Sequence, residues 1–232
     1  MTENSYQQFC PVAMAAEILG SRWTVLLLRE LIAGSTRFND LRRGLPRMSP
    51  ALLSKRLKEL EAAGIVQRVA IGATSDIQEY QLTASGRDLR PLVDAFGNWG
   101  QKWVETDASL RNLDVNLLMW DLRRNIRTDP MPRKRCTILF YYPELPPAQR
   151  KWWLVVEAGE DTDLCLVDPG FDIDLYVNVD LKTMTGIWLG YENVATARQQ
   201  DRMRITGSRA IEQAIEQWLG LSPFAKTSKF VA

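Results

Sequence analysis

Histidine is absent from the 232 residues of this chain. Without an imidazole, the chain cannot form a Ser-His-Asp or Cys-His nucleophilic site, and it lacks the usual nitrogen ligand of protein-bound metals. Cysteine is scarce as well, since only Cys10, Cys136 and Cys165 occur and they lie far apart. Such spacing favours neither a disulfide framework nor a cysteine-rich zinc site. Because no acid-base set replaces the missing histidine, we expect no enzyme and no cofactor.

Long apolar runs are also missing, and the N-terminal stretch MTENSYQQ has neither a basic start nor an apolar core. A signal peptide or a membrane-spanning helix needs these features. We therefore expect a cytoplasmic protein with no membrane partner. Hydrophobic residues make up 46% of the chain and charged residues 25%, which predicts one large or two modest folded domains.

Several aspartates gather between residues 161 and 174, a composition that could indicate a calcium site. Their spacing does not match a twelve-residue calcium loop with its closing glutamate. Alternation along a strand already explains the last two of them, so we predict no metal. The aspartates are Asp161, Asp163, Asp168, Asp172 and Asp174.

Residues 38–64 contain two short helical patterns separated by Gly44-Leu45-Pro46. The second pattern begins at Ser49-Pro50, because a serine side chain can accept from first-turn amides and a proline leaves no amide unpaired there. Leucines at helical spacing then predict a buried face, formed by Leu53, Leu57 and Leu60. The opposite side carries Ala51, Leu52, Lys55 and Lys58, with Arg56 on its flank.

Positive charge is concentrated around these two helices. Between Arg37 and Arg68 there are eight basic and three acidic side chains, although the whole chain carries a net charge of only +1. A helix that presents small and basic side chains outward can enter a DNA major groove. An ordinary helical hairpin with solvated charges is the alternative. The residues predicted to contact DNA are Arg37, Arg42, Arg43, Arg47, Ser49, Ala51, Leu52, Lys55, Arg56 and Lys58.

Two short strand patterns follow directly, at residues 65–71 and 79–83, with a turn-rich polar segment between them. Two strands placed after a recognition helix form a wing. The order of helix, turn, helix and wing therefore predicts a winged helix-turn-helix domain. The wing tip, Ala73-Thr74-Ser75-Asp76, lacks basic residues, which argues against DNA binding by the tip.

Ordered blocks of residues across about 9–104 resemble the pattern of one family. The blocks are Cys10-Pro11-Val12, Gly20-Ser21-Arg22-Trp23-Thr24, Leu28-Arg29-Glu30-Leu31, Arg37-Phe38-Asn39-Asp40-Leu41, Met48-Ser49-Pro50, Leu53-Ser54, Arg56-Leu57-Lys58-Glu59-Leu60, Gly64-Ile65-Val66, Tyr80-Gln81-Leu82-Thr83 and Gly86. They resemble the HxlR family of bacterial winged-helix transcription regulators, relatives of the MarR group. The resemblance implies a homodimer that binds a palindromic operator in double-stranded DNA.

The remaining helices of this half have distinct expected roles. Residues 11–19 and 23–32 are predicted helices, the second forming the floor of the core. Arg22 at its start could contact a phosphate or form a surface ion pair. Residues 85–105 are predicted to form a long dimerisation helix, because large apolar side chains there need a partner. These are Leu92, Phe96, Trp99 and Trp103; packing on a second domain is the alternative.

Cys10 stands beside Pro11 at the head of the first predicted helix. Amide dipoles at such a position lower a thiol pKa and favour the reactive thiolate. Cys10 is therefore a redox candidate, and resemblance to relatives with a cysteine there implies oxidant or electrophile sensing. The alternative is a small residue packed near the dimer interface.

The pattern changes in the C-terminal half. Residues 110–127 are predicted to be helical, and the prolines of 128–132 end that helix. Strands are predicted at 136–142, 152–157, 164–167, 171–180 and 202–205, and helices at 181–189, 193–200 and 209–219. Strands followed by helices indicate an α+β domain.

This half resembles the sterol carrier protein type 2 fold, through DLYVNVDLKTMTGIWLG at 174–190, the ending at 204–225 and the predicted strand order. The resemblance implies a tunnel for an apolar small-molecule effector. The candidate lining residues are Trp153, Tyr176, Leu181, Met184 and Trp188, and ordinary core packing is the alternative for each.

The predicted architecture is α+β, with an N-terminal winged helix-turn-helix domain, a long dimerisation helix and a C-terminal mixed α/β sterol-carrier-like domain. The predicted boundaries are 1–106 for the DNA-binding and dimerisation domain, 107–132 for a helical linker, 133–225 for the ligand-binding domain and 226–232 for a tail. The favoured function is a DNA-binding transcription regulator. The alternative is a carrier of hydrophobic ligands whose winged helix mediates protein contacts.

Overall fold

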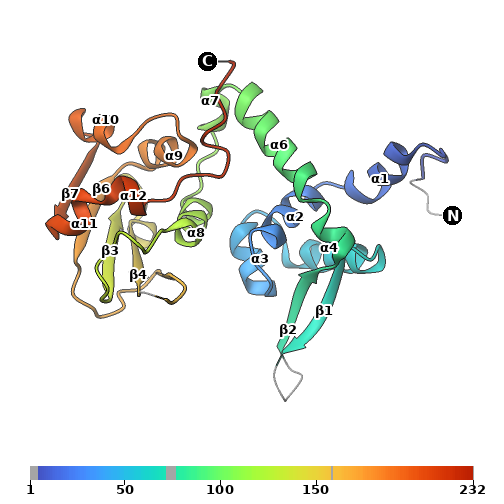
Figure 1. Cartoon of the computed structure of the whole chain (residues 1–232), viewed down its shortest axis with the longest axis horizontal. Coiled ribbons are helices and arrows are strands. Elements are labelled where there is room, and N and C mark those ends of the chain that lie inside the picture. Colours follow the sequence, from blue (N-terminus) through green and yellow to red (C-terminus); the bar gives the residue numbers. More distant parts are fainter. Residues whose placement is uncertain (1–4, 72–76, 158, 232) are drawn as a thin grey trace. The chain divides into compact units, whose positions relative to one another are not determined.

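The computed structural model describes residues 5–71, 77–157 and 159–231. The chain divides into two compact units, Met1–Gly97 and Asn98–Ala232, and the division falls within one helix (Figure 1). The Ala73-Thr74-Ser75-Asp76 segment of the expected wing tip lies outside the described residues.

The N-terminal unit is a helix-turn-helix followed by an antiparallel hairpin, which confirms the predicted order of elements. Its elements are α1 (Pro11–Leu19), α2 (Thr24–Ile32), α3 (Phe38–Gly44), α4 (Pro50–Ala62), β1 (Val66–Ile71), β2 (Ile77–Leu82), α5 (Ala84–Arg87) and the start of α6 (Arg90–Trp103). In Figure 1 the hairpin extends away from the helices of the unit. The strands pair from Val66 opposite Leu82 to Ile71 opposite Ile77.

Helix α4 begins as its sequence predicts. The Ser49 Oγ accepts from the Leu52 amide at 3.3 Å, and Pro50 occupies the first helical position. Leu53, Leu57 and Leu60 are all buried in the core, together with leucines of α2 and α3. The buried face of α4 is therefore confirmed.

A buried carboxylate lies beneath the turn that joins α3 to α4. Glu30 of α2 is fully buried; it forms an ion pair with Arg29 and accepts from the Ser35 Oγ at 3.1 Å. Arg29 also donates to the carbonyl of Gly44, the last residue of α3, at 3.0 Å. A buried charge of this kind is tolerated only when it is paired and hydrogen-bonded. These contacts fix the end of α3 against α2.

The C-terminal unit is built on a five-stranded sheet in the order β5-β4-β3-β6-β7, in which the β3–β6 pair is parallel and the β5–β4, β4–β3 and β6–β7 pairs are antiparallel. The strands are β3 (Cys136–Tyr141), β4 (Lys151–Val156), β5 (Asp163–Cys165), β6 (Leu175–Val179) and β7 (Met203–Gly207). The helices are α7 (Thr106–Ser109), α8 (Val115–Asn125), the 3-10 turn η1 (Pro147–Gln149), α9 (Leu181–Leu189), α10 (Val194–Gln199), α11 (Arg209–Gln213) and α12 (Ile215–Trp218). Every second residue of β6 enters the core, as alternation predicts.

Several expected elements are shorter than predicted. The helix expected over 85–105 is divided into α5 and α6, and the one expected over 209–219 is interrupted at Ala214. The strand expected over 171–180 begins only at Leu175. The Asp174 carboxylate next to it accepts from the Thr137 amide at 2.9 Å and from the Lys134 Nζ at 2.8 Å. These hydrogen bonds to its side chain add to those of its backbone, because the Asp174 amide donates to the Thr137 carbonyl at 2.9 Å and its carbonyl accepts from the Ser208 amide at 2.7 Å.

The stretch 107–132 is not a separate linker. Helix α8 starts directly after Asp114, whose carboxylate caps the first turn by accepting from the Asn116 amide at 3.0 Å. Its apolar side chains join the core of the C-terminal unit, as does Met131 beyond it. Those from α8 are Val115, Leu118, Met119 and Leu122.

Among the described helices, none is by itself long and apolar enough to cross a membrane. The pair α1 and α2, which would pass on length and composition, is bent by 81°.

Substitution of Gly44 by alanine should weaken the N-terminal unit, because the new Cβ would overlap the buried Glu30 carboxylate. Overpacking of this kind costs roughly 2 kcal/mol. Native-state hydrogen exchange of the α2 and α4 amides would measure the loss, with the β3 and β4 amides of the other unit as an internal reference. The matched control is Gly100→Ala, where an added Cβ meets no atom within 4 Å. Equal behaviour of the two variants would contradict the role assigned to Glu30.

Candidate nucleic-acid interface

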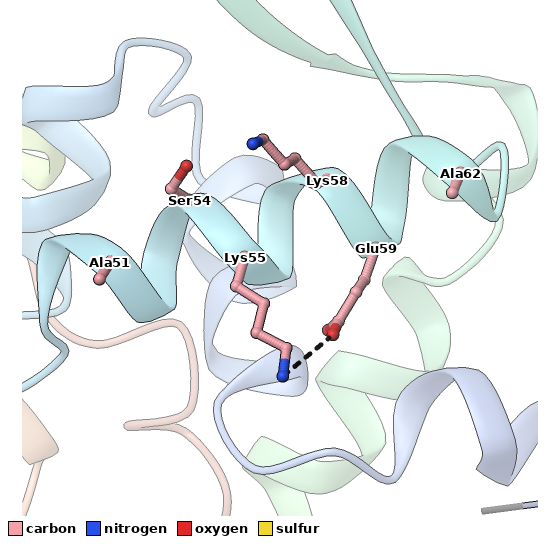
Figure 2. A pocket seen from close by; sticks show the side chains of 6 residues that line it. All are labelled: Ala51, Ser54, Lys55, Lys58, Glu59 and Ala62. Carbon is pink, nitrogen blue, oxygen red and sulfur yellow. Dashed lines mark ion pairs between the residues drawn. The ribbon is translucent and has the colours of Figure 1, made fainter. Parts of the chain in front are cut away.

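The outward face of α4 is a stripe of small and charged side chains. Six residues line a shallow depression on it: Ala51, Ser54, Lys55, Lys58, Glu59 and Ala62 (Figure 2). They recur three or four residues apart, opposite the buried leucines. Three of these residues were not among those predicted to contact DNA, although helical spacing counted from Ala51 leads to each of them. They are Ser54, Glu59 and Ala62. This stripe is the candidate surface for a DNA groove.

Two lysines give the stripe its positive charge. The Lys55 side chain is 67% exposed, and its Nζ lies 4.0 Å from the Glu59 Oε1, as Figure 2 shows. An exposed pair at that distance contributes little stability, so the ammonium can turn toward another anion. Lys58 is also exposed and extends away from that pair in Figure 2. Both lysines are placed as the sequence predicts.

Two of the residues predicted on this face have other partners. The side chain of Arg56 is only 16% exposed; its Nε donates to the Arg22 carbonyl at 3.2 Å and its guanidinium pairs with Glu59. Leu52 is half-buried against the N-terminal core. The prediction of an open Arg56 and Leu52 is therefore corrected, since neighbouring elements occupy both side chains. Arg22 itself lies over the Trp23 ring, 5.7 Å from its centroid.

The other predicted basic residues surround the turn and the hairpin. Arg37 pairs with Glu79 of β2 at 3.3 Å, and Arg43 pairs with Asp40 at 3.4 Å. Arg42 and Arg47 are exposed, as is Ser49, whose hydroxyl oxygen is used as the helix cap. On β1, a hydrogen bond from Arg68 to Glu61 raises the pKa of that guanidinium. These surface pairs leave the cations within reach of solvent and of a phosphate backbone.

The apolar stripe predicted for dimerisation is exposed along α6. Leu92 is 41%, Phe96 58%, Trp99 63% and Trp103 42% exposed. Helix α1 adds a second uncovered apolar surface, since none of its residues is buried. Phe9, just before α1, is 99% exposed and Val12 is 76% exposed. The sequence did not predict this second surface, because the apolar residues of so short a helix could equally have belonged to the buried core.

The five residues predicted to line a ligand pocket do not meet at one place. Leu181, Met184 and Trp188 of α9 are buried in the main core. Strand alternation puts Trp153 and Tyr176 on the opposite face of the sheet, because their neighbours Trp152 and Leu175 point into that core. Tyr176 is 47% exposed, whereas Trp153 is buried and its Nε1 has no hydrogen-bond partner among the described residues.

Cys10 occupies the N-cap position of α1. The backbone amides of Ala13 and Val12, at the head of that helix, lower the pKa of its thiol. Burial has the opposite effect on the other two cysteines, since it raises the pKa of Cys136 and of Cys165. In the part of the chain that the structure describes, no group of three or more cysteine, aspartate or glutamate side chains is placed to hold a metal ion.

Comparison with known proteins gives matches to part of the chain. Residues 18–108 match the family described as HxlR-like helix-turn-helix. The uncharacterised HTH-type transcriptional regulator YvaP of Bacillus subtilis is 38% identical over 99 residues, which are 42% of this chain and 92% of that protein. The uncharacterised HTH-type transcriptional regulator sll1512 of Synechocystis sp. is 35% identical over 99 residues, 43% of this chain and 73% of that protein. The reduced form of the transcriptional regulator YodB from B. subtilis is a solved structure with 33% identity and a TM-score of 0.36, covering 40% of this chain and 93% of that chain.

The thiol of Cys10 should react with iodoacetamide faster than that of Cys165 at neutral pH. A lowered pKa means that more of the Cys10 thiol is deprotonated there, and a raised pKa means the reverse for Cys165. Mass spectrometry of the labelled peptides across a pH series would measure both rates, with Cys10→Ser as the control. If Cys165 reached its half-maximal rate at the lower pH, the assignment of the amide effect to Cys10 would be wrong.

Proposed function

Over its first hundred or so residues the chain belongs to the HxlR family of helix-turn-helix transcriptional regulators, and we propose that it binds a palindromic operator as a homodimer through the outward face of α4. The observation that carries this proposal is the stripe of small and basic side chains on α4, opposite its buried leucines. A helix of this kind can approach base edges closely because its outward side chains are short or flexible.

The N-terminal half of α4 is the part proposed to read the DNA. Ala51 and Ser54 are small and leave room for the groove floor, and Lys55 can reach a base edge or a phosphate. Glu59 lies one turn further along, and its carboxylate would repel phosphates there. Arg37, Arg42, Arg43 and Arg47 would contact the backbone and fix the orientation of the helix.

Dimerisation is proposed through the apolar stripe of α6, and the exposed side chains of α1 are proposed as a second part of the interface. Uncovered aromatic side chains of this size are typical of protein interfaces. A two-fold dimer would present two copies of α4 about 34 Å apart, one turn of DNA, which accounts for a palindromic operator. Cys10 lies next to these exposed α1 side chains, and we include it in the proposal as an oxidant-sensitive group.

The C-terminal unit is proposed to bind an apolar effector, in keeping with its resemblance to the sterol carrier protein type 2 fold. Leu181, Met184 and Trp188 share one core on α9 and are the proposed contact points. The second candidate function is a carrier of hydrophobic ligands whose winged helix contacts proteins. Retention on DNA at low salt separates the two, because only a regulator requires it. Action on DNA also agrees with the cytoplasmic location expected from the sequence.

Lys55→Ala should weaken operator binding by about 1 kcal/mol, roughly a fivefold rise in Kd, because one cationic contact is lost. Fluorescence anisotropy with a selected operator at several salt concentrations would measure this. A phosphate contact would also reduce the salt slope by about one. Lys182→Ala removes an exposed lysine of α9 and is the matched control.

Arg56→Ala distinguishes a loss of stability of the N-terminal unit from a loss of DNA affinity. Because Arg56 holds the Arg22 carbonyl, its loss should lower the stability of the N-terminal unit, which Lys55→Ala should leave unchanged. An unchanged Kd for Lys55→Ala at moderate salt would move the DNA contact to another surface.

Phe96→Glu should convert the dimer into a monomer at micromolar concentration, since a carboxylate in the middle of the α6 stripe would be buried without a partner. Sedimentation velocity would follow the change, and Phe96→Leu, which keeps an apolar side chain, should stay dimeric. A dimer that persisted in Phe96→Glu would place the interface elsewhere.

A further inference from the structure

Residues 222–230, here called the tail, follow α12 and pack on the C-terminal end of α9. The Ser222 amide donates to the Trp188 carbonyl at 2.8 Å. Gly190 ends α9 in the left-handed region, with φ of +76°. A Cβ at Gly190 would lie 2.7 Å from the Ala225 carbonyl oxygen and 2.9 Å from the Ala225 Cβ. The tail thus approaches α9 so closely that only glycine fits between them.

The same tail then runs along the C-terminal half of α6. The Thr227 Oγ1 is hydrogen-bonded to the Asn98 Oδ1 at 2.6 Å, and the Phe230 amide donates to the Lys102 carbonyl at 2.9 Å. The Phe230 ring lies against the Trp103 ring, with centroids 4.9 Å apart. The Lys102 Nζ is 4.7 Å from the Phe230 centroid, within the range of a cation–π contact.

A chain of side-chain hydrogen bonds joins the tail, α9 and α6. The Lys229 Nζ donates to the Tyr191 hydroxyl at 2.9 Å, and that hydroxyl donates to the Gln101 Oε1 at 3.4 Å. The Gln101 Nε2 donates to the Leu189 carbonyl at 2.9 Å. Leu189 is the last residue of α9, where carbonyls lack partners within the helix. The Gln101 residue, only 8% exposed, therefore supplies α9 with a donor from α6.

The tail contacts both α9 and the C-terminal half of α6, and the two helices have different roles in the proposed function. Helix α9 belongs to the main core of the C-terminal unit through Met184 and Ile187, so its end must follow any rearrangement of that core. The C-terminal half of α6 carries Trp99 and Trp103, the last two aromatic residues of the exposed stripe. Phe230 is 68% exposed, so release of the tail from α6 would expose little additional apolar surface of that ring.

We propose that residues 222–230 form a clasp that holds the C-terminal half of α6 on the end of α9 and thereby transmits rearrangements of the C-terminal core to the dimer interface. The transmission rests on the proposed dimer function of α6. The clasp itself does not, because every contact that forms it lies within residues 98–230.

The test uses the full chain carrying Lys229→Ala together with Phe230→Ala. Without the clasp, amides of residues 101–104 should exchange with deuterium about fivefold faster or more, because this helix end gains freedom to open. Amides of α2 and β3 should not change. Lys226→Ala is the matched control, since it removes an exposed lysine of the same tail. A second variant, Gln101→Ala, should accelerate exchange in residues 189–191 as well as in α6.

Unchanged exchange at residues 101–104 in both variants would overturn the clasp. The dimer dissociation constant, measured by sedimentation, should rise at least about threefold in the double variant, as expected when an interface helix loses order. Faster exchange with an unchanged dissociation constant would overturn the transmission. A parent chain that is monomeric would instead refute the proposed function, and the exchange result would still decide whether the clasp exists.

Discussion

The buried carboxylate of Glu30 is the interaction on which the N-terminal unit depends. It joins Arg29, Ser35 and the end of α3 at Gly44 in one set of contacts beneath the turn that precedes α4. An isolated charge would not be stable there, so these partners must all be in place before the unit is complete. Their positions fix where α3 ends, and the capped start at Ser49 follows within five residues. The buried carboxylate thus fixes the end of α3, five residues before the cap of α4.

The sequence was sufficient where local rules decide the structure. The Ser49-Pro50 start, the buried leucines of α4 and the order of helices and hairpin could all be predicted, because caps and helical spacing are properties of neighbouring residues. Arg56 and Leu52 show the limit of such rules. Spacing gives the angle of a side chain around its own helix, whereas the Arg22 carbonyl that binds Arg56 comes from another element. The same limit applies to α8, whose apolar face could be recognised but not the core that it joins.

The C-terminal unit separates its two sheet faces more strictly than its sequence suggested. Alternation along β6 could be predicted, yet the predicted pocket combined residues from both faces. Met184 belongs to the α9 side and Tyr176 to the other, so no single cavity can use both. Residue types alone could not reveal this, because large apolar side chains occur on both sides of β4. Knowledge of the strand register was needed, and that depends on pairings across 40 or so residues of chain.

Glu59 has a further consequence for the proposed contact of α4 with DNA. Its carboxylate already offers Lys55 a weak, solvent-exposed counterion at 4.0 Å. In the proposed complex, a duplex of any sequence would compete with that anion for Lys55, which would weaken sequence-independent binding. A cognate site offers additional contacts and loses proportionally less. An acidic residue on a basic helix would therefore lower the affinity for DNA in general more than the affinity for the operator.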